Sequence, residues 1–149
     1  DQRHRHRAAQ QRVKPVADFV VHYEGGLRCH VAHPDNGAAL VMDASKELGG
    51  PGESFSPSDL LSVSLGGCVL SIMAMAGRVA GLDLAGATAT VTKTMGNAPR
   101  RITMLGVTVR VPGQYDAAQR KRLEAAAAAC PVHAVLGIDA PIAIVWDEE

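Results

Sequence analysis

The sequence predicts a fold that mixes antiparallel β-strands with α-helices, and three observations indicate it. Short β-type runs fill residues 18–44 and are separated by turn pairs of glycine or asparagine-glycine type. A long helix is predicted from residue 57 to about residue 80, with apolar side chains over most of its circumference. Two further runs then alternate with a period of two, as strands do.

The first strands are expected over residues 18–24, 27–33 and 38–44, where the runs read DFVVHYE, LRCHVAH and AALVMDA. The turns between them contain Gly25-Gly26 and Asn36-Gly37, which favour tight reversals of the chain. We therefore expect an antiparallel meander. The segment that follows, ELGGPGESFSP, is rich in glycine and proline and is expected to be a loop.

The long helix has a clear start signal. Ser56 is a suitable N-cap, Pro57 fits the first helical position, and Asp59 stands where a capping box requires an acid. Glycines 66 and 67 weaken a helix intrinsically, so close contact with another backbone is the expected compensation. The remaining elements are a hairpin over residues 88–95 and 102–111, a helix over 116–129 broken at Pro131, and a strand over 141–146.

Composition limits the classes of function. The chain has 149 residues and a formal net charge of zero, with 15 basic and 15 acidic residues, so we expect no nucleic-acid partner and no membrane surface. The apolar run at residues 60–80 is interrupted by glycine, serine and arginine, which argues against a membrane span. Residues 1–17 form a basic N-terminal arm, either solvated or a binding patch, and residues 18–149 a single domain.

The cysteines are the residues with the most distinctive chemistry. Their number is three, an odd count at wide spacing, which is a poor disulfide framework and favours a reducing, cytoplasmic setting without a signal peptide. Cys68 lies in the apolar helix and is either a core residue or a sheltered nucleophile. Cys130 precedes Pro131 and is either buried structure or an N-cap thiol made acidic by the helix dipole. Cys29 is expected to pack on a strand, since no cluster of metal ligands surrounds it.

Two motifs at this spacing resemble the OsmC/Ohr family of thiol peroxidases. They are SPSDLLSVSLGGC, which ends at Cys68, and AAAACPV, which contains Cys130. The resemblance covers residues 18–146 and includes the ELGGPG loop before the helix. It implies an α+β, OsmC-like fold in which antiparallel sheets wrap long central helices in an intertwined homodimer.

The resemblance also implies a reaction. In the family the helix cysteine attacks a hydroperoxide and becomes a sulfenic acid, and the Cys-Pro cysteine then forms a disulfide with it. Carried over, Cys68 is the peroxidatic thiol and Cys130 the resolving thiol, in an antioxidant enzyme without haem, flavin or metal. Its partners would be a second copy of the chain, a small hydroperoxide and a dithiol or lipoyl-type reductant.

A thiolate in an apolar pocket also requires a charge partner. The family supplies an arginine from the N-terminal strands, and Arg28 stands close to its place; the alternative is an ordinary exposed strand arginine. The family holds that arginine with a glutamate directly after the helix-initiating proline, where this chain has Ser58. The next residue, Asp59, is rotated by about 100° from position 58 on a helix and is expected to cap the helix. Glu53, in the preceding loop, is a candidate to orient the arginine.

Three hypotheses follow from these patterns. The first is a homodimeric cysteine peroxidase, which predicts a Cys68 thiol of low pKa within disulfide reach of Cys130. The second is a non-enzymatic OsmC-like dimer that binds a small apolar ligand or senses redox state. The third is an intertwined dimer whose cysteines only pack. His133, three residues after Cys130, either tunes that thiol or packs.

Overall fold

The computed structural model describes residues 16–148. The basic arm expected over residues 1–17 therefore lies outside the described residues except for its last two positions. The chain divides into two compact units, of which the first ends at Ser54 and the second begins at Phe55.

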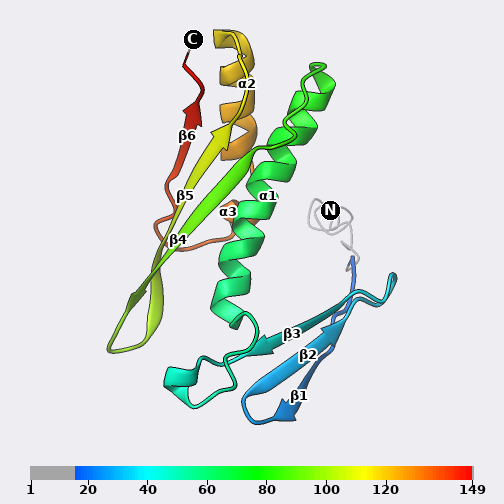
Figure 1. The fold of residues 1–149 in the computed structure, drawn as a ribbon, viewed down its shortest axis with the longest axis vertical. Coiled ribbons are helices and arrows are strands. Elements are labelled where there is room, and N and C mark those ends of the chain that lie inside the picture. Colours follow the sequence, from blue (N-terminus) through cyan, green and yellow to red (C-terminus); the bar gives the residue numbers. More distant parts are fainter. Residues whose placement is uncertain (1–15, 149) are drawn as a thin grey trace, which may run out of the picture. The chain divides into compact units, whose positions relative to one another are not determined.

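The first unit is a three-stranded antiparallel sheet in the order β1-β2-β3, as the turn pairs predicted (Figure 1). Its strands are β1 (Val21–Gly25), β2 (Arg28–Ala32) and β3 (Ala39–Asp43), and a 3₁₀ turn, η1 (Lys46–Leu48), follows. The first reversal needs left-handed backbone, with φ of 89° at Gly25 and 60° at Gly26. Glycine adopts this conformation without a steric penalty, which is why this pair ends β1.

The register of this sheet sorts its side chains onto two faces. Tyr23 pairs with Cys29 and Cys29 with Met42, so these three share one face with Val21, Val31 and Leu40. Arg28 pairs with Asp43 on the opposite face. One face is therefore apolar and the other carries the charges.

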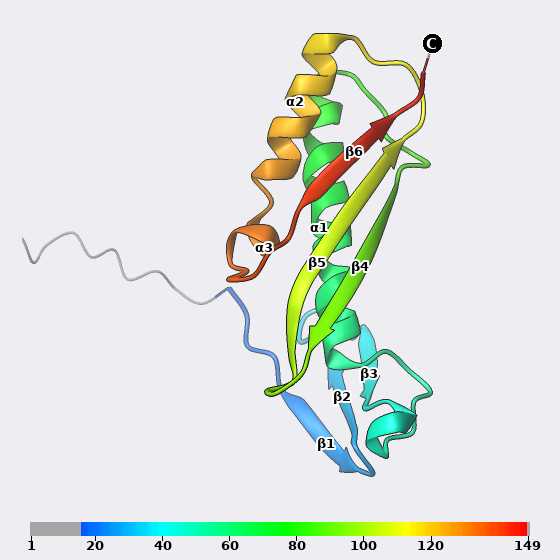
Figure 2. The same ribbon diagram turned by 90° about the vertical axis from the view of Figure 1, so that its left-hand side faces the viewer.

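The second unit packs two helices against a mixed sheet. Its elements are α1 (Pro57–Val79), β4 (Thr88–Gly96), β5 (Arg101–Val111), α2 (Ala117–Ala128), α3 (Pro131–Ala134) and β6 (Ile142–Trp146). The sheet order is β4-β5-β6, with the predicted hairpin antiparallel and β6 parallel to β5. Figure 2 shows α1 and α2 side by side along one face of this sheet, and both helices contact it.

Helix α1 begins with the predicted capping box. The Ser56 hydroxyl accepts the Asp59 amide at 3.1 Å, and the Asp59 carboxylate accepts the Ser56 amide at 3.0 Å. A single chain buries only one stripe of this helix instead of the full circumference expected from its apolar residues. The buried stripe consists of Ser62, Leu65, Gly66, Val69, Met73 and Gly77. Val63, Met75 and Val79 are exposed, because one sheet and one helix cover only one side.

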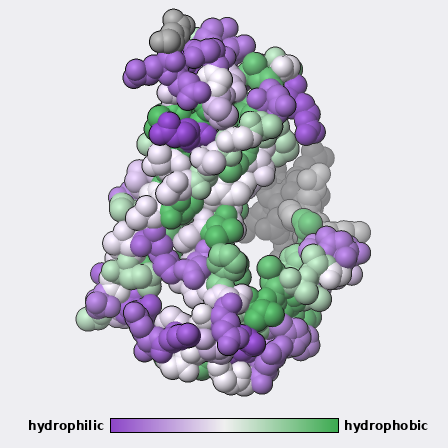
Figure 3. Space-filling view, viewed as in Figure 1, coloured by the Kyte–Doolittle hydropathy of each residue, from purple (hydrophilic) through white to green (hydrophobic). Residues whose placement is uncertain are grey.

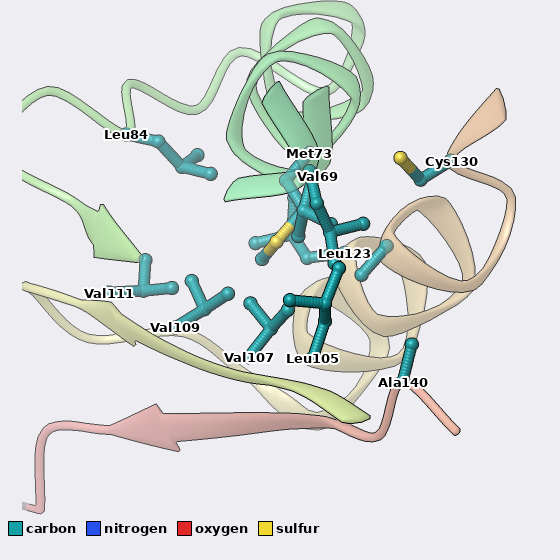
Figure 4. Close-up of a cluster of buried hydrophobic side chains, with 12 residues drawn as sticks. Val69, Met73, Leu84, Leu105, Val107, Val109, Val111, Leu123, Cys130 and Ala140 are labelled. Atoms are coloured by element: carbon teal, nitrogen blue, oxygen red, sulfur yellow. The ribbon is translucent and has the colours of Figure 1, made fainter. Parts of the chain in front are cut away.

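The core of the second unit lies between α1 and β5. Figure 4 shows alternate β5 side chains, from Leu105 to Val111, pointing toward Val69 and Met73 of α1, and all are at most 2% exposed. Gly66 lets α1 lie close to the neighbouring strand β4, because a Cβ there would lie 2.9 Å from Cγ2 of Val91. By length and composition α1 could also cross a membrane, but core helices of water-soluble folds pass the same criteria.

Candidate active site

Cys130 is the N-cap of the short helix α3. It ends the turn after α2, and Pro131 starts α3, as the Cys-Pro pair predicted. The Cys130 side chain is fully buried, and its Sγ accepts the backbone N–H of His133 at 3.5 Å. The fold therefore holds this sulfur in one place, at the edge of the core drawn in Figure 4.

Cys68 lies on α1 and is half-buried against the same core. The Cys130 thiol and the backbone N–H of Val132, the second residue of α3, lie close enough to the Cys68 thiol to shift its pKa. Two residues far apart in the sequence thus place their thiols close to one another. Such a pair is arranged to give up two electrons and two protons and form a disulfide.

The surroundings of this pair favour the neutral thiol. Burial raises the pKa of Cys68 above its ordinary value, and the hydrogen bond with Cys130 raises it further. The Val132 amide acts in the opposite direction but does not reverse the shift. The surroundings of Cys68 within the second unit therefore favour the protonated thiol, whereas the peroxidase hypothesis predicted a low pKa.

His133 packs beside the second thiol. One ring nitrogen lies 2.7 Å from the carbonyl oxygen of Ala140, so the imidazole ties α3 to the segment before β6. The ring also borders a groove of about 490 Å³ between α2 and β6. Of the two alternatives for His133, packing describes its ring, and its contact with the Cys130 sulfur is made by the backbone amide.

Arg28 belongs to the first unit and is not an ordinary exposed arginine. Its Nε and Nη2 donate to the two carboxylate oxygens of Asp43 at 2.7 and 2.8 Å, and Nη2 also donates to Glu53 at 3.1 Å. The hydrogen bonds from Arg28 hold the pKa of Asp43 below its usual range, and the two acids raise the pKa of Arg28. Glu53, the candidate from the loop, does contact the guanidinium.

The structure thus brings Cys68 and Cys130 together in the second unit and places Arg28 among its acids in the first. Within residues 16–148, no group of three or more His, Cys, Asp or Glu side chains is arranged to hold a metal ion. Cys29 is half-buried on β2 opposite Met42.

Comparison with known proteins identifies the fold and the family. The OsmC-like protein family matches residues 50–145, which include both thiols. The chain belongs to the OsmC-like family. A crystal structure from Psychrobacter arcticus, described provisionally as an osmotic stress induced and detoxification response protein, is 31% identical with a TM-score of 0.81. The match covers 90% of this chain and 98% of that one.

Two more distant structures share the α+β OsmC-like fold. An organic hydroperoxide resistance protein from Legionella pneumophila is 20% identical with a TM-score of 0.67, over 88% of this chain and 98% of that one. A protein from Vibrio cholerae that is provisionally described in the same way, with captopril bound in one of its active sites, is 22% identical with the same TM-score. That match covers 90% of this chain and 95% of the other. No curated protein matches the chain.

The OsmC-like chain departs from the family pattern at Ser58, and the structure shows what surrounds this residue. The Lys93 ammonium on β4 donates to the Ser58 hydroxyl at 3.0 Å and to Asp59 Oδ1 at 2.7 Å. The pKa of Asp59 is lowered, first by this lysine and then by the capping amide of Ser56. The expected capping role of Asp59 is confirmed, and a cation contacts the hydroxyl that stands in place of the family glutamate.

Sequence reasoning missed two of these residues. Asp43 was predicted only as the end of an apolar strand, and its contact with Arg28 depends on the strand register. An acid that ends an otherwise apolar strand was the available signal. Lys93 was one member of an alternating run, and no pattern in the sequence pointed to Ser58 as its partner.

Proposed function

We propose that this OsmC-like protein is a thiol-dependent peroxidase that reduces hydroperoxides and resolves itself as an intramolecular disulfide. The proximity of the Cys68 and Cys130 thiols in one core supports the proposal, because a resolving thiol must reach the oxidised sulfur at once. The family relatives that are named organic hydroperoxide resistance proteins support the choice of substrate.

The reaction takes two steps in the protein and one with a reductant. The Cys68 thiol first loses its proton, and the thiolate attacks the terminal oxygen of R–O–OH. The O–O bond breaks, the alkoxide takes up the proton that Cys68 released and leaves as the alcohol, and the sulfur becomes a sulfenic acid. The Cys130 thiol then attacks that sulfur, water leaves, and the disulfide forms. A dithiol or lipoyl-type reductant supplies two electrons and two protons to restore both thiols.

Arg28 is the proposed charge partner of the Cys68 thiolate. The second unit alone raises the pKa of Cys68, so an additional cation is needed to populate the nucleophile at neutral pH. Arg28 is held in a fixed position by Asp43 and keeps its charge at every physiological pH. It is therefore the cation best suited to this task.

A homodimer is the proposed assembly, with residues 18–149 acting as one domain in each copy. Figure 3 shows apolar side chains at the surface of the molecule, and several are large. Val63, Met75 and Val79 are more than half exposed on α1, and Val21, Tyr23 and Leu40 are more than half exposed on the apolar face of the β1-β2-β3 sheet. Large exposed apolar side chains gathered on one face of an element, as on this sheet, are typical of a surface that a partner covers. We place the enzyme in the reducing cytoplasm, where its thiols would be regenerated.

The test is turnover with purified protein. Loss of cumene hydroperoxide is followed in the presence of a dithiol for the wild type, Cys68→Ser, Cys130→Ser and, as a matched control, Cys29→Ser. We expect activity in the wild type and in Cys29→Ser and none in Cys68→Ser. Cys130→Ser is expected to accumulate sulfenic and then sulfinic acid at Cys68, which mass spectrometry detects. A wild type that stays reduced and inert with both cumene hydroperoxide and hydrogen peroxide contradicts the proposal.

A second candidate is a non-enzymatic dimer that senses redox state or binds a small apolar ligand. The raised pKa of Cys68 favours it, because a protonated thiol reacts slowly with peroxides. The same experiment separates the two. A sensor forms one disulfide per chain slowly and shows no catalytic turnover.

A further inference from the structure

The two acids that contact Arg28 differ in how they are held. The Asp43 side chain has no exposed surface, whereas 71% of the Glu53 side chain is exposed. Both contact the same guanidinium. A buried carboxylate is costly to move, and an exposed one exchanges readily with water.

Asp43 is fixed from several directions. Its two oxygens accept from Nε and Nη2 of Arg28, and Oδ2 also accepts the backbone N–H of Glu53 at 3.0 Å. A backbone contact with Ser54 adds to these and, with them, keeps the pKa of Asp43 low. The carboxylate therefore joins β2, β3 and the loop that leads out of the first unit. A side-on pair of this type fixes the plane of the guanidinium as well as its place.

Glu53 binds a different edge of the Arg28 guanidinium from the one that Asp43 binds. A guanidinium has five N–H groups, and the side-on pair with Asp43 uses one on Nε and one on Nη2. Glu53 accepts from Nη2, and within the described residues neither hydrogen on Nη1 has a partner. The outer edge of the guanidinium, formed by Nη1 and Nη2, could bind an anion end-on. Glu53 uses only the Nη2 side of this edge, and its carboxylate is mostly exposed to water.

The net charge of Arg28, Asp43 and Glu53 also favours departure of Glu53 before a thiolate binds. With both acids in place, one cation faces two carboxylates and the group has a net charge of −1 (1 minus 2). A group of that sign does not attract a thiolate. When Glu53 leaves, Asp43 and Arg28 form a neutral pair whose outer edge still presents N–H donors. An anionic sulfur can then take the place of the Glu53 carboxylate.

We propose that Asp43 is the positioning residue for Arg28, and that Glu53 is an exchangeable partner whose departure frees the outer edge of the guanidinium for the reacting sulfur anion. The proposal rests on the peroxidase function above. It assigns opposite effects to two acids that touch one arginine. Asp43 takes the structural task that the family gives to a glutamate on the helix, and Glu53 competes with the thiolate.

The test compares kcat/KM for cumene hydroperoxide in Asp43→Asn, Glu53→Gln and the control Glu47→Gln, which removes an exposed acid from η1 that is not a partner of Arg28. We expect Asp43→Asn to lower kcat/KM on the order of tenfold to a hundredfold, because a misplaced catalytic group costs that much. Glu53→Gln should raise it roughly two- to fivefold, the range of one exposed charge contact. Glu47→Gln should match the wild type.

Two further measurements keep a folding defect apart from a positioning effect. In the Arg28→Gln background, Asp43→Asn should have no additional effect on kcat/KM, because Asp43 acts through the arginine. The pH midpoint for alkylation of Cys68 is read in a chain that also has Cys29→Ser and Cys130→Ser. Glu53→Gln should lower this midpoint and Asp43→Asn should raise it.

The inference would be overturned if Asp43→Asn and Glu53→Gln changed kcat/KM in the same direction. It would also be overturned if Asp43→Asn lowered kcat/KM as much in the Arg28→Gln background as in the wild type. Failure of the proposed function looks different. In that case the wild type itself does not turn over, or Cys68→Ser turns over as fast as the wild type. If the wild type is active and Glu53→Gln is slower than Glu47→Gln, the peroxidase function is supported and the exchangeable role of Glu53 is wrong.

Discussion

The two units of the chain are stabilised by different kinds of interaction. The second unit buries Leu65, Val69, Met73 and alternate residues of β5 in an apolar core. Among the described residues of the first unit, the only fully buried side chain is Asp43, a charged one. One unit is held by apolar packing, and the other by strand pairing and an ion pair.

This difference explains how the two halves of the proposed site divide the chemistry. An apolar core holds the two thiols close together but raises the pKa of Cys68. A charged cluster holds a cation but has little core, and a three-stranded sheet without a buried apolar face is marginal in water. Each unit lacks what the other has, so the proposed activity requires both, together with a surface that covers the apolar face of β1-β2-β3.

The largest expected effect separates the two kinds of stability directly. Leu65→Ala removes a fully buried side chain from the core and should lower the free energy of unfolding by about 2–5 kcal/mol. Leu40→Ala on β3, where the side chain is 53% exposed, should cost less than about 1 kcal/mol in the isolated chain. Urea denaturation of both variants measures the difference.

Leu40→Ala also tests whether a second copy of the chain covers the apolar face of the first unit. If a second copy covers Leu40, the cost of Leu40→Ala should grow with protein concentration, because dissociation then accompanies unfolding. An equal and concentration-independent cost for both leucines would mean that the two units are stabilised in the same way, and the comparison would fail.

Much of this fold could be predicted from local patterns. The turn at Gly25-Gly26, the capping box at Ser56 and the stop at Pro131 place their elements within a few residues, because each depends on the chemistry of adjacent residues. The parallel pairing of β6 with β5 was not predicted, since it depends on tertiary packing. For the same reason one chain alone buries only one side of α1, although the sequence predicted burial on nearly all sides.

The candidate site was predictable only in part. The proximity of Cys68 and Cys130 was expected from the family resemblance, and the cap position of Cys130 from the residues themselves. The pair of Arg28 with Asp43 required the register of β2 and β3, which the sequence does not determine to one residue. The raised pKa of Cys68 is a balance of burial and hydrogen bonds that only coordinates supply.

A smaller effect is expected at the polar start of the apolar unit. Ser56→Ala removes the hydroxyl that accepts the Asp59 amide and should lower the free energy of unfolding by about 1 kcal/mol. Ser64→Ala is the matched control, because its hydroxyl is exposed and makes only a 3.4 Å contact within the helix. Thermal unfolding followed by circular dichroism compares them. If Ser64→Ala lowered the free energy of unfolding as much as Ser56→Ala, the stabilising role assigned to the Ser56 cap would be wrong.

The smallest expected effect concerns the ion pair of Lys93 with Asp59 in the second unit, whose acid is partly exposed, whereas the acid of the first unit's pair, Asp43, is buried. Lys93→Gln removes the main cause of the lowered pKa of Asp59, whose side chain is 43% exposed, so the cost at pH 7 should stay below about 1 kcal/mol.

The sign of its pH dependence follows from that shift. A carboxyl whose pKa is lowered on folding stabilises the folded state above its unfolded pKa of about 4, and this contribution disappears as the pH falls through the folded value. The difference in stability between the wild type and Lys93→Gln should therefore be full at pH 6 and should shrink as the pH falls below about 4 and through the lowered folded pKa of Asp59. A difference that stays unchanged throughout this acid range would show that Lys93 acts through Ser58 or through packing of its stem, and the ion pair would then contribute nothing.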